Sequence, residues 1–454
     1  MRLKISGGRL FDPACGWHGE ARDLYIEGRR IVPRLSRVDR VMEAKGRSVV
    51  AGGIDLRGQV ATYGLHFRRA AGGMPSPRDL GETYARLGYT HVHEPFLTLY
   101  TANYVHRQLA ALPVVDTSAS LVLNLRDLDL WLQSPEHLPA VGETLQFLLE
   151  RTRSLNLRLV EPFVQYRQTY YAPRSIATAR ALEILAELAR GQKLTLALEA
   201  SPEVLGADLP EPQVFHLAAL GPALVADDLL AAALTHLEKG GTADMGLMDP
   251  GRGQGPGVPG IQVDLGWFRP LNLCPAPDEA AARRALSLAL AYQGDGLAFS
   301  GAGIFQAQVQ DYLRLFAWLG DRSARRRDWG EELDSREYSL SQWVWATRNL
   351  PARLLGFQDR GRLCPGARAD VAIYDLAPGA DGGKFPGRCR TLLKAGEVVV
   401  EDYRLVKPEV AHATYWRETG AAATALLQDL CQYRSLRPEN LWVQPELEVT
   451  WEKI

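Results

Sequence analysis

Three residues of this chain stand at a spacing that could support metal chemistry. His91 and His93 are one residue apart on a strand-like run, and Glu94 follows directly. Alternate residues of a strand point to the same side, so these imidazoles could bind one cation with the carboxylate nearby. The alternative is a hydrogen-bonded pair in the core or in a loop, which we favour. A hydrolase site rebuilt around His91, His93 and Glu94 therefore remains the secondary hypothesis.

A second group of charged and polar residues lies near the ends of other expected strands. Its members are Asp55, Arg57, Gln59, Arg158, Glu161, Glu199 and His216. Neither a guanidinium nor an amide is a suitable zinc ligand, so the arginines and Gln59 of this group would not bind that metal. Arginine also keeps its charge when it is buried, so each buried guanidinium should meet a carboxylate. We predict that Arg57 pairs with Glu199 or Asp55, and Arg158 with Glu161 or Glu199.

The elements that must position these residues alternate between helices and short apolar strands. Helices are expected at 176–190, 278–292 and 340–349, and strands at 157–160, 194–198 and 297–300. Roughly 300 residues of such alternation favour an α/β fold with a TIM-like (β/α)8 barrel, in which sites lie at the C-terminal ends of the strands. Short β-like runs separated by turns come before this stretch and return after it.

A series of motifs resembles the A subunit of formylmethanofuran dehydrogenase and of the formyltransferase/hydrolase complex, in the amidohydrolase superfamily. The family patterns G-I-D, G-Y-T-x-V-N-E-P, E-Y-S-L, T-R-x-x-P-A and G-A-x-A-D-V-A-I-Y-D correspond to residues 53–55, 88–95, 337–340, 347–352 and 366–375. Each motif alone is weak, but together they are specific and extend over most of residues 1–405.

The resemblance implies a composite β-sandwich built from both ends of the chain. We expect residues 1–50 to form its N-terminal half, 51–349 a degenerate amidohydrolase barrel, and 350–405 the C-terminal half of the sandwich. Residues 406–454 form a C-terminal extension that carries tryptophans and tyrosines. These residue types are enriched at the cores of interfaces, so we expect the extension to contact a partner.

In the family this subunit is a binuclear zinc amidohydrolase, and the resemblance indicates where its ligands should fall. The first strand of the family reads G-I-D-x-H-x-H, so the two histidines correspond to Arg57 and Gln59. The carboxylated lysine falls at Arg158, and the next histidine at Ala197 or Glu199. The last histidine falls near Leu220, and the aspartate at Ala302. We therefore predict no metal and no other cofactor in this chain.

The leading hypothesis is a metal-free, non-catalytic scaffold subunit. It would belong to a formyltransferase/hydrolase-like or formylmethanofuran-dehydrogenase-like complex in tetrahydromethanopterin-linked one-carbon metabolism, with the other subunits as partners. Enzyme activity of this chain itself is uncertain, because its own amidohydrolase site is expected to be inactive. Pairing of both arginines would leave a plugged pocket; a free guanidinium would instead offer a site for formate.

Composition agrees with a globular protein that does not bind nucleic acid or membranes. The 454 residues include 46% hydrophobic and 23% charged residues, with a formal net charge of -1. No signal peptide or membrane span is apparent, so we expect the cytoplasm. The five cysteines are widely spaced and contain no C-x-x-C pair, which indicates neither a disulfide framework nor a zinc knuckle.

Overall fold

The computed structural model describes most of the chain. The residues left out of the description are 63–74, 125–127, 129–130, 133–136, 161–177, 192–194, 208, 247–261, 264–270, 273–278, 302–311, 330–335, 379–383, 434–435 and 445–446. Glu161 and Ala302 fall within these gaps, so the predictions made for them lie outside the described residues.

The two ends of the chain build one sheet, as the sequence predicted. Its N-terminal strands are β1 (Arg2–Asp12), β2 (Trp17–Glu27), β3 (Arg30–Val32), β4 (Arg40–Glu43) and β5 (Ser48–Ala51). Its C-terminal strands are β16 (Val371–Pro378), β17 (Lys384–Lys394), β18 (Glu397–Glu401) and β19 (Arg404–Leu405). The two sets meet where β5 pairs antiparallel with β16, from Ala51 beside Val371 to Ser48 beside Tyr374.

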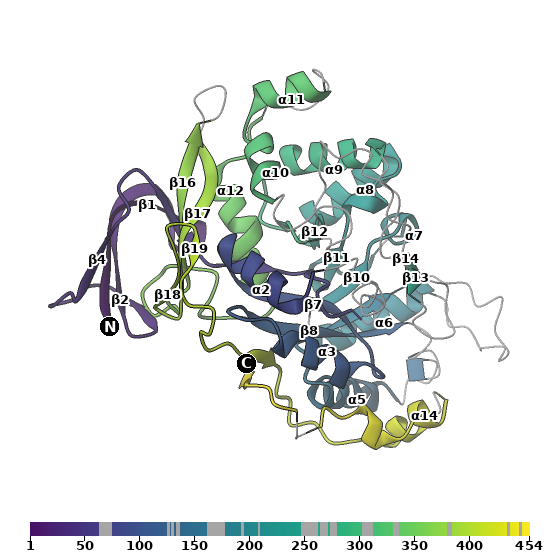
Figure 1. Ribbon diagram of the computed structural model, residues 1–454. Coiled ribbons are helices and arrows are strands. Elements are labelled where there is room, and N and C mark those ends of the chain that lie inside the picture. The colour runs from purple at the N-terminus through teal and green to yellow at the C-terminus, as the bar shows by residue number, and fades with distance from the viewer. Residues whose placement is uncertain are drawn as a thin grey trace.

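A second sheet forms the barrel and stands beside the first (Figure 1). Its parallel strands, in sheet order, are β6 (Gly53–Asp55), β7 (Tyr89–Leu97), β8 (Asp116–Asn124), β9 (Asn156–Val160), β10 (Leu196–Glu199), β11 (Phe215–Ala218), β12 (Thr242–Asp244) and β15 (Leu297–Ala298). This order follows the chain, as expected for consecutive β/α units. A short hairpin, β13 (Gln262–Val263) with β14 (Leu271–Asn272), lies between β12 and β15 in the sequence.

Helices cover the outside of the barrel (Figure 1). They are α2 (Pro77–Arg86), α3 (Ala102–Ala110), α5 (Leu138–Arg151), α6 (Thr178–Gly191), α7 (Pro202–Leu205), α8 (Asp227–Glu238), α9 (Glu279–Ala291), α10 (Tyr312–Leu319) and α11 (Arg322–Trp329). Helix α2 begins with a capping box, in which Ser76 and Asp79 satisfy each other's backbone amides. Its buried face carries Leu80, Tyr84 and Ala85, which pack against the barrel. No helix in the described part of the chain has both the length and the apolar character needed to cross a membrane.

The helix predicted at 340–349 extends further than expected. α12 (Leu340–Val344) continues through a π-helical turn, η7 (Trp345–Asn349), into α13 (Leu350–Leu354). A π-helical turn is a local insertion in the helix that often occurs at functional positions. Here it buries Arg348, whose guanidinium hydrogen bonds to the hydroxyl of Tyr374 on β16. The turn therefore connects the barrel helices to the composite sheet.

The C-terminal extension contributes to the barrel sheet. Strand β20 (Thr414–Trp416) pairs parallel with the first residues of β8, and β21 (Trp451–Lys453) pairs with β20. Helix α14 (Ala425–Tyr433) lies against α5. Tyr415 and Trp416 are buried, so this part of the extension stabilises the fold. Its role as an interface stays a prediction.

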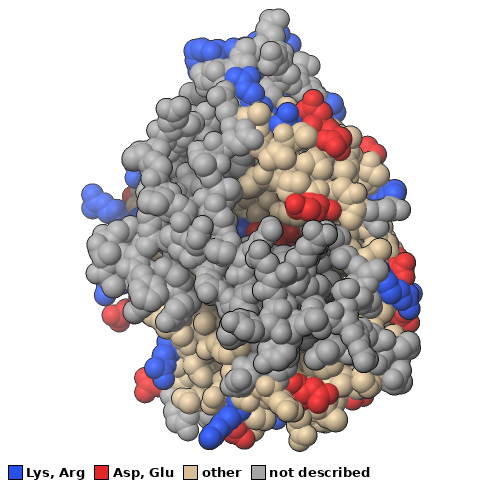
Figure 2. Space-filling view, turned by 90° about the vertical axis from the view of Figure 1, so that its right-hand side faces the viewer, with Lys and Arg blue, Asp and Glu red and all other residues tan. Residues whose placement is uncertain are grey.

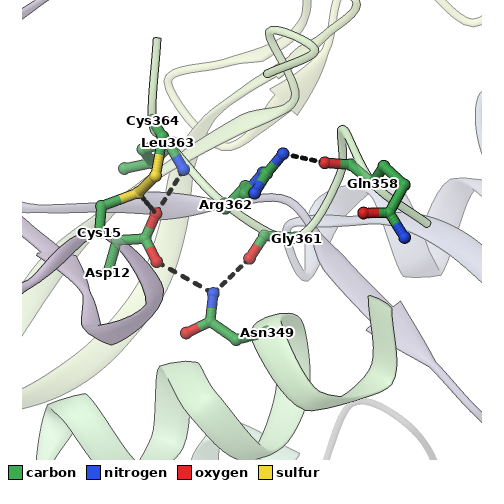
Figure 3. Close-up of a disulfide and its surroundings, with 8 residues drawn as sticks. All are labelled: Asp12, Cys15, Asn349, Gln358, Gly361, Arg362, Leu363 and Cys364. Atoms are coloured by element: carbon green, nitrogen blue, oxygen red, sulfur yellow. Dashed lines mark hydrogen bonds between the residues drawn. A yellow bond between two sulfur atoms is a disulfide. The ribbon is translucent and has the colours of Figure 1, made fainter. Parts of the chain in front are cut away.

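A disulfide joins the two halves of the composite sheet, and here the sequence prediction was wrong. Cys15 and Cys364 are bonded, with their Cα atoms 5.7 Å apart (Figure 3). They are separated by 349 residues in the sequence. Because the pairing depends on the return of the chain after the whole barrel, local cysteine spacing could not indicate it.

Candidate functional site

Among the residues that the structure describes, an ion network, and no set of metal ligands, occupies the position where the family resemblance implies zinc. The Arg57 guanidinium donates two hydrogen bonds to the Glu199 carboxylate, of 2.7 and 3.1 Å. Arg158 also donates to Glu199, from the neighbouring strand β9. Both arginines are buried, and Glu199 is largely buried between them. This arrangement confirms the predicted pairings of Arg57 and Arg158 with Glu199.

Strand register explains how Arg158 meets the Glu199 carboxylate. Arg158 on β9 lies beside Ala197 on β10, which in turn lies beside His216 on β11. Glu199 stands two residues further along β10 and faces the same side as Ala197. Since the Ala197 side chain is small, it leaves room for the long Arg158 side chain to extend to Glu199. Leu220, at the other predicted ligand position, is buried in the hydrophobic core.

The environment of this network keeps all three groups charged. Burial alone would raise the pKa of Glu199, but Arg158 and Arg57 bring that pKa below its usual value. Burial lowers the pKa of Arg158, yet a guanidinium starts so high that it stays protonated. Both guanidinium groups also lie over the ring of Phe96, 5.3 Å from its centre for Arg57 and 4.9 Å for Arg158.

Asp55 and Gln59 flank Arg57 and have opposite surroundings. Asp55 accepts hydrogen bonds from the amides of Arg57 and Gly301, of 3.0 and 2.7 Å, and from the Tyr84 hydroxyl at 2.6 Å. Burial nevertheless raises its pKa.

Gln59 is fully buried with φ 46°, and neither polar atom of its side-chain amide has a hydrogen-bond partner within the described residues. An amide in this state is costly, and replacing it by an apolar group should be tolerated.

A polar layer lies on β11, on β12 and after β15, and of its members only His216 had been named from the sequence. His216 contacts Asp244 at 3.0 Å through Nε2 and Thr242 at 3.1 Å through Nδ1, and Ser300 donates to the other Asp244 oxygen. Burial would raise the pKa of Asp244, but the bond with His216 holds it well below its usual value. The strand end Thr242-Ala243-Asp244 carries the signal that could have indicated this aspartate, since it ends a short strand after α8.

His91 and His93 form the hydrogen-bonded pair that we favoured. Nε2 of His91 and Nδ1 of His93 each lie 2.8 Å from the Ser118 hydroxyl, and Nε2 of His93 lies 2.7 Å from Ser120. Burial lowers the pKa of both histidines, that of His93 to about 3. Glu94 instead accepts from the amides of Ala61 and Phe96, at 2.7 and 3.1 Å.

The secondary metal-site hypothesis therefore lacks a converging ligand set. In the described part of the chain, the one group of three possible ligands within 4.8 Å of each other is Asp12, Cys15 and Cys364, outside the barrel. The barrel interior keeps a cavity of about 30 Å³, lined among others by His93, Arg158, His216 and Asp244. That volume holds about two water molecules.

A second buried ion network fixes the barrel to the composite sheet. The Asp116 carboxylate, at the start of β8, lies 2.6 Å from Lys394, 2.6 Å from Arg360 and 3.2 Å from Arg368. Asp116 and Lys394 are completely buried. Burial opposes the charged carboxylate, but the three cations hold the pKa of Asp116 far below its usual value. No sequence motif had indicated this cluster, because its members come from segments that lie far apart along the chain.

Charges on the face shown in Figure 2 are mixed. Basic and acidic residues lie among each other around its rim, and acidic residues also lie near its middle. This distribution agrees with the formal net charge of -1.

Comparison with known proteins places the chain beside one group of relatives. It is 26% identical to the A subunit of the formyltransferase/hydrolase complex Fhc from Methylorubrum extorquens, over 89% of each chain. It is also 26% identical to the protein FwdA of Methanocaldococcus jannaschii, over 36% of this chain and 32% of that protein. Residues 306–400 match the model of the amidohydrolase family. These findings confirm the resemblance that the motifs indicated.

Solved structures give the same result for the fold. The crystal structure of the formyltransferase/hydrolase complex from Methylorubrum extorquens, with methylofuran, contains a chain that superposes with a TM-score of 0.83 at 22% identity. The alignment covers 100% of this chain and 99% of that one. Dihydropyrimidinase from Brevibacillus agri superposes with a TM-score of 0.57 at 14% identity, over 91% and 98% of the two chains. A TIM-like barrel with a composite sheet is thus the fold of this protein.

Proposed function

We propose that this chain is a non-catalytic subunit, with a metal-free barrel, of a complex of the formyltransferase/hydrolase or formylmethanofuran dehydrogenase type. It would act in formyl and formate metabolism in the cytoplasm, where its partners would be the other subunits. Similarity to the A subunit of such a complex, over nearly the whole length of both chains, supports the type of complex. The ion network of Arg57, Arg158 and Glu199 carries the proposal that the barrel is inactive.

The residues at the implied zinc positions do not fit two zinc ions. Guanidinium groups at Arg57 and Arg158 have no free lone pair and would repel a cation. Ala197 and Leu220 offer no ligand atom, and the Gln59 amide is a poor substitute for an imidazole. Glu199 could serve as a ligand by its type, but both arginines already occupy its carboxylate. We therefore derive no hydrolytic step for this barrel.

A scaffold role would explain why charged residues are buried at this position. An amidohydrolase barrel that loses its cations loses their binding free energy, and its strand ends need another cross-link. Arg57 on the segment after β6 and Arg158 on β9 both bind Glu199 on β10, so the network ties three strands at the position of the lost cations. The chain can then keep the shape that its partners recognise without keeping the chemistry.

Affinity purification of the tagged chain from its own cells tests the assignment to a complex. We expect chains related to the other subunits of the formyltransferase/hydrolase complex to elute with it in fixed proportion. Elution of this chain alone, at physiological salt, would contradict the proposal.

Activity of the purified complex tests the inactive barrel separately. Gln59→Ala stands at a position where the family uses a zinc-binding histidine, and it removes a buried amide without a partner among the described residues. We expect this variant to assemble normally and to keep the formyl hydrolysis rate of the unmodified complex. A large loss of rate in an intact complex would show that the barrel takes part in the reaction.

A further inference from the structure

We propose that Asp12, Cys15 and Cys364 form a binding site for one soft divalent cation, such as Zn²⁺, when the two cysteines are reduced. This site lies in the composite sheet, outside the barrel, and does not depend on the proposed function. Two thiolates and a carboxylate are ligands that zinc accepts, with a water molecule as the fourth.

The three side chains already converge (Figure 3). One ligand atom from each lies within 4.8 Å of those of the other two. Sγ of Cys15 lies 2.9 Å from Oδ2 of Asp12, although a disulfide sulfur carries no proton to donate to that oxygen. Such a contact is better satisfied when a thiol proton or a cation stands between the two atoms. After reduction the two sulfurs must move apart, because each thiolate would bind zinc at about 2.3 Å.

Charge favours a cation at the same point. Asp12 is fully buried, and the Leu363 amide and the Asn349 side chain donate hydrogen bonds to its carboxylate. Arg362 acts on the carboxylate electrostatically, but no lysine, arginine or histidine of the described residues forms a direct ion pair with it. A bound cation would supply the missing countercharge.

Reduction controls the site through thiol–disulfide exchange. A dithiol reductant attacks one sulfur, the bond between Cys15 and Cys364 breaks, and two electrons and two protons pass to the pair. The reductant leaves as its own disulfide. Zinc then binds the two thiolates and releases their two protons. Both cysteines are partly exposed, so a reductant can reach them.

The site would keep the composite sheet closed in a reducing compartment. Cys15 ends the short helix η1 (Pro13–Cys15) after β1, and Cys364 lies between α13 and β16. A disulfide between two partly exposed cysteines is not expected to persist under reducing conditions. A cation at Asp12, Cys15 and Cys364 would replace the covalent link there and join the same two segments.

Cobalt titration of the reduced full-length chain tests the proposal, because thiolate ligation to Co²⁺ gives a charge-transfer absorption band. We expect a band that saturates at one equivalent and that Zn²⁺ abolishes by displacement. Cys15→Ser and Cys364→Ser should each lose the band, while Cys389→Ala and Cys431→Ala, which replace cysteines that are buried and unbonded, should keep it. Absence of the band in the reduced chain, or its persistence in Cys364→Ser, would overturn the proposal.

The carboxylate and the folding of the variants need their own measurements. Asp12→Asn should weaken cobalt binding at least tenfold, and unchanged affinity would remove Asp12 from the site. Zn²⁺ should raise the melting temperature of the reduced chain and leave that of Cys364→Ser unchanged. An equal rise in both proteins would place the bound cation elsewhere.

Discussion

The Arg57 guanidinium makes a bidentate contact with the Glu199 carboxylate, with its shorter hydrogen bond 2.7 Å long, at the position where the family resemblance implies a zinc ion. The two residues are 142 positions apart: Arg57 follows β6 and Glu199 ends β10, and these strands are not neighbours in the barrel sheet. In the family a metal ion supplies the positive charge at this position. In this chain an arginine side chain supplies it. Because Arg158 binds the same carboxylate, the network has two cations and one anion.

Replacing Arg57 by methionine should destabilise the protein. The change removes the hydrogen bonds of Arg57 but leaves Glu199 paired with Arg158, so the free energy of unfolding should fall by about 2 kcal/mol. Urea denaturation followed by circular dichroism measures this quantity. Arg78→Met is the matched control, because the Arg78 side chain is 71% exposed in its pair with Glu82, and its stability should be unchanged. Unchanged stability of Arg57→Met with a loss of formate binding would instead make Arg57 a ligand-binding residue.

Stability should depend on pH through His93. Its pKa is about 3 in the folded protein, against an ordinary 6.5, because burial disfavours the charged form of the ring. Between these two values the unfolded chain binds a proton that the folded chain excludes. The free energy of unfolding should therefore fall as pH decreases from 6.5 towards 3, and His93 contributes about 1.4 kcal/mol per pH unit to this slope.

His93→Gln isolates that contribution, because glutamine can still bond to Ser118 and Ser120. Urea denaturation at several pH values within this window should give a shallower slope for the variant by about one proton. His18→Gln, which replaces an exposed histidine, is the control substitution. Parallel slopes for His93→Gln and the unmodified chain would show that His93 is protonated in the folded state.

Removing the Asp116 carboxylate should lower the free energy of unfolding more than removing one of the cations that surround it. Asp116→Asn leaves Arg360, Arg368 and Lys394 crowded without their shared carboxylate, and should lower the free energy of unfolding by about 4 kcal/mol. Lys394→Met leaves Asp116 paired with both arginines and should cost clearly less. Equal losses in urea denaturation would mean that Lys394 alone balances the carboxylate.

The sequence predicted the features that arise from local patterns and from charge. Alternating helices and strands indicated the barrel, and motifs at both ends indicated the composite sheet. The pairing of Arg57 and Arg158 with Glu199 could also be predicted, because a buried guanidinium needs a carboxylate and few carboxylates were available near the strand ends.

Features that depend on long-range packing could not be predicted. Cys15 contacts Cys364, and Asp116 contacts Lys394. Both contacts require that the chain first forms the barrel sheet and then returns to the composite sheet. Asp244, the partner of His216, was missed because its strand has three residues and therefore gives only a weak pattern, although its place at a strand end was a signal. Strand β20 was expected to belong to a separate extension, because three residues are too few to show a strand periodicity.

Zinc content of the purified protein tests the metal-free barrel most directly. The measurement should use the chain with both Cys15→Ser and Cys364→Ser, so that the proposed site in the composite sheet cannot contribute. The cells should be grown with added zinc, and elemental mass spectrometry should be calibrated against protein concentration. We expect no stoichiometric zinc in this variant. A binuclear zinc content, retained through gel filtration, would contradict the account.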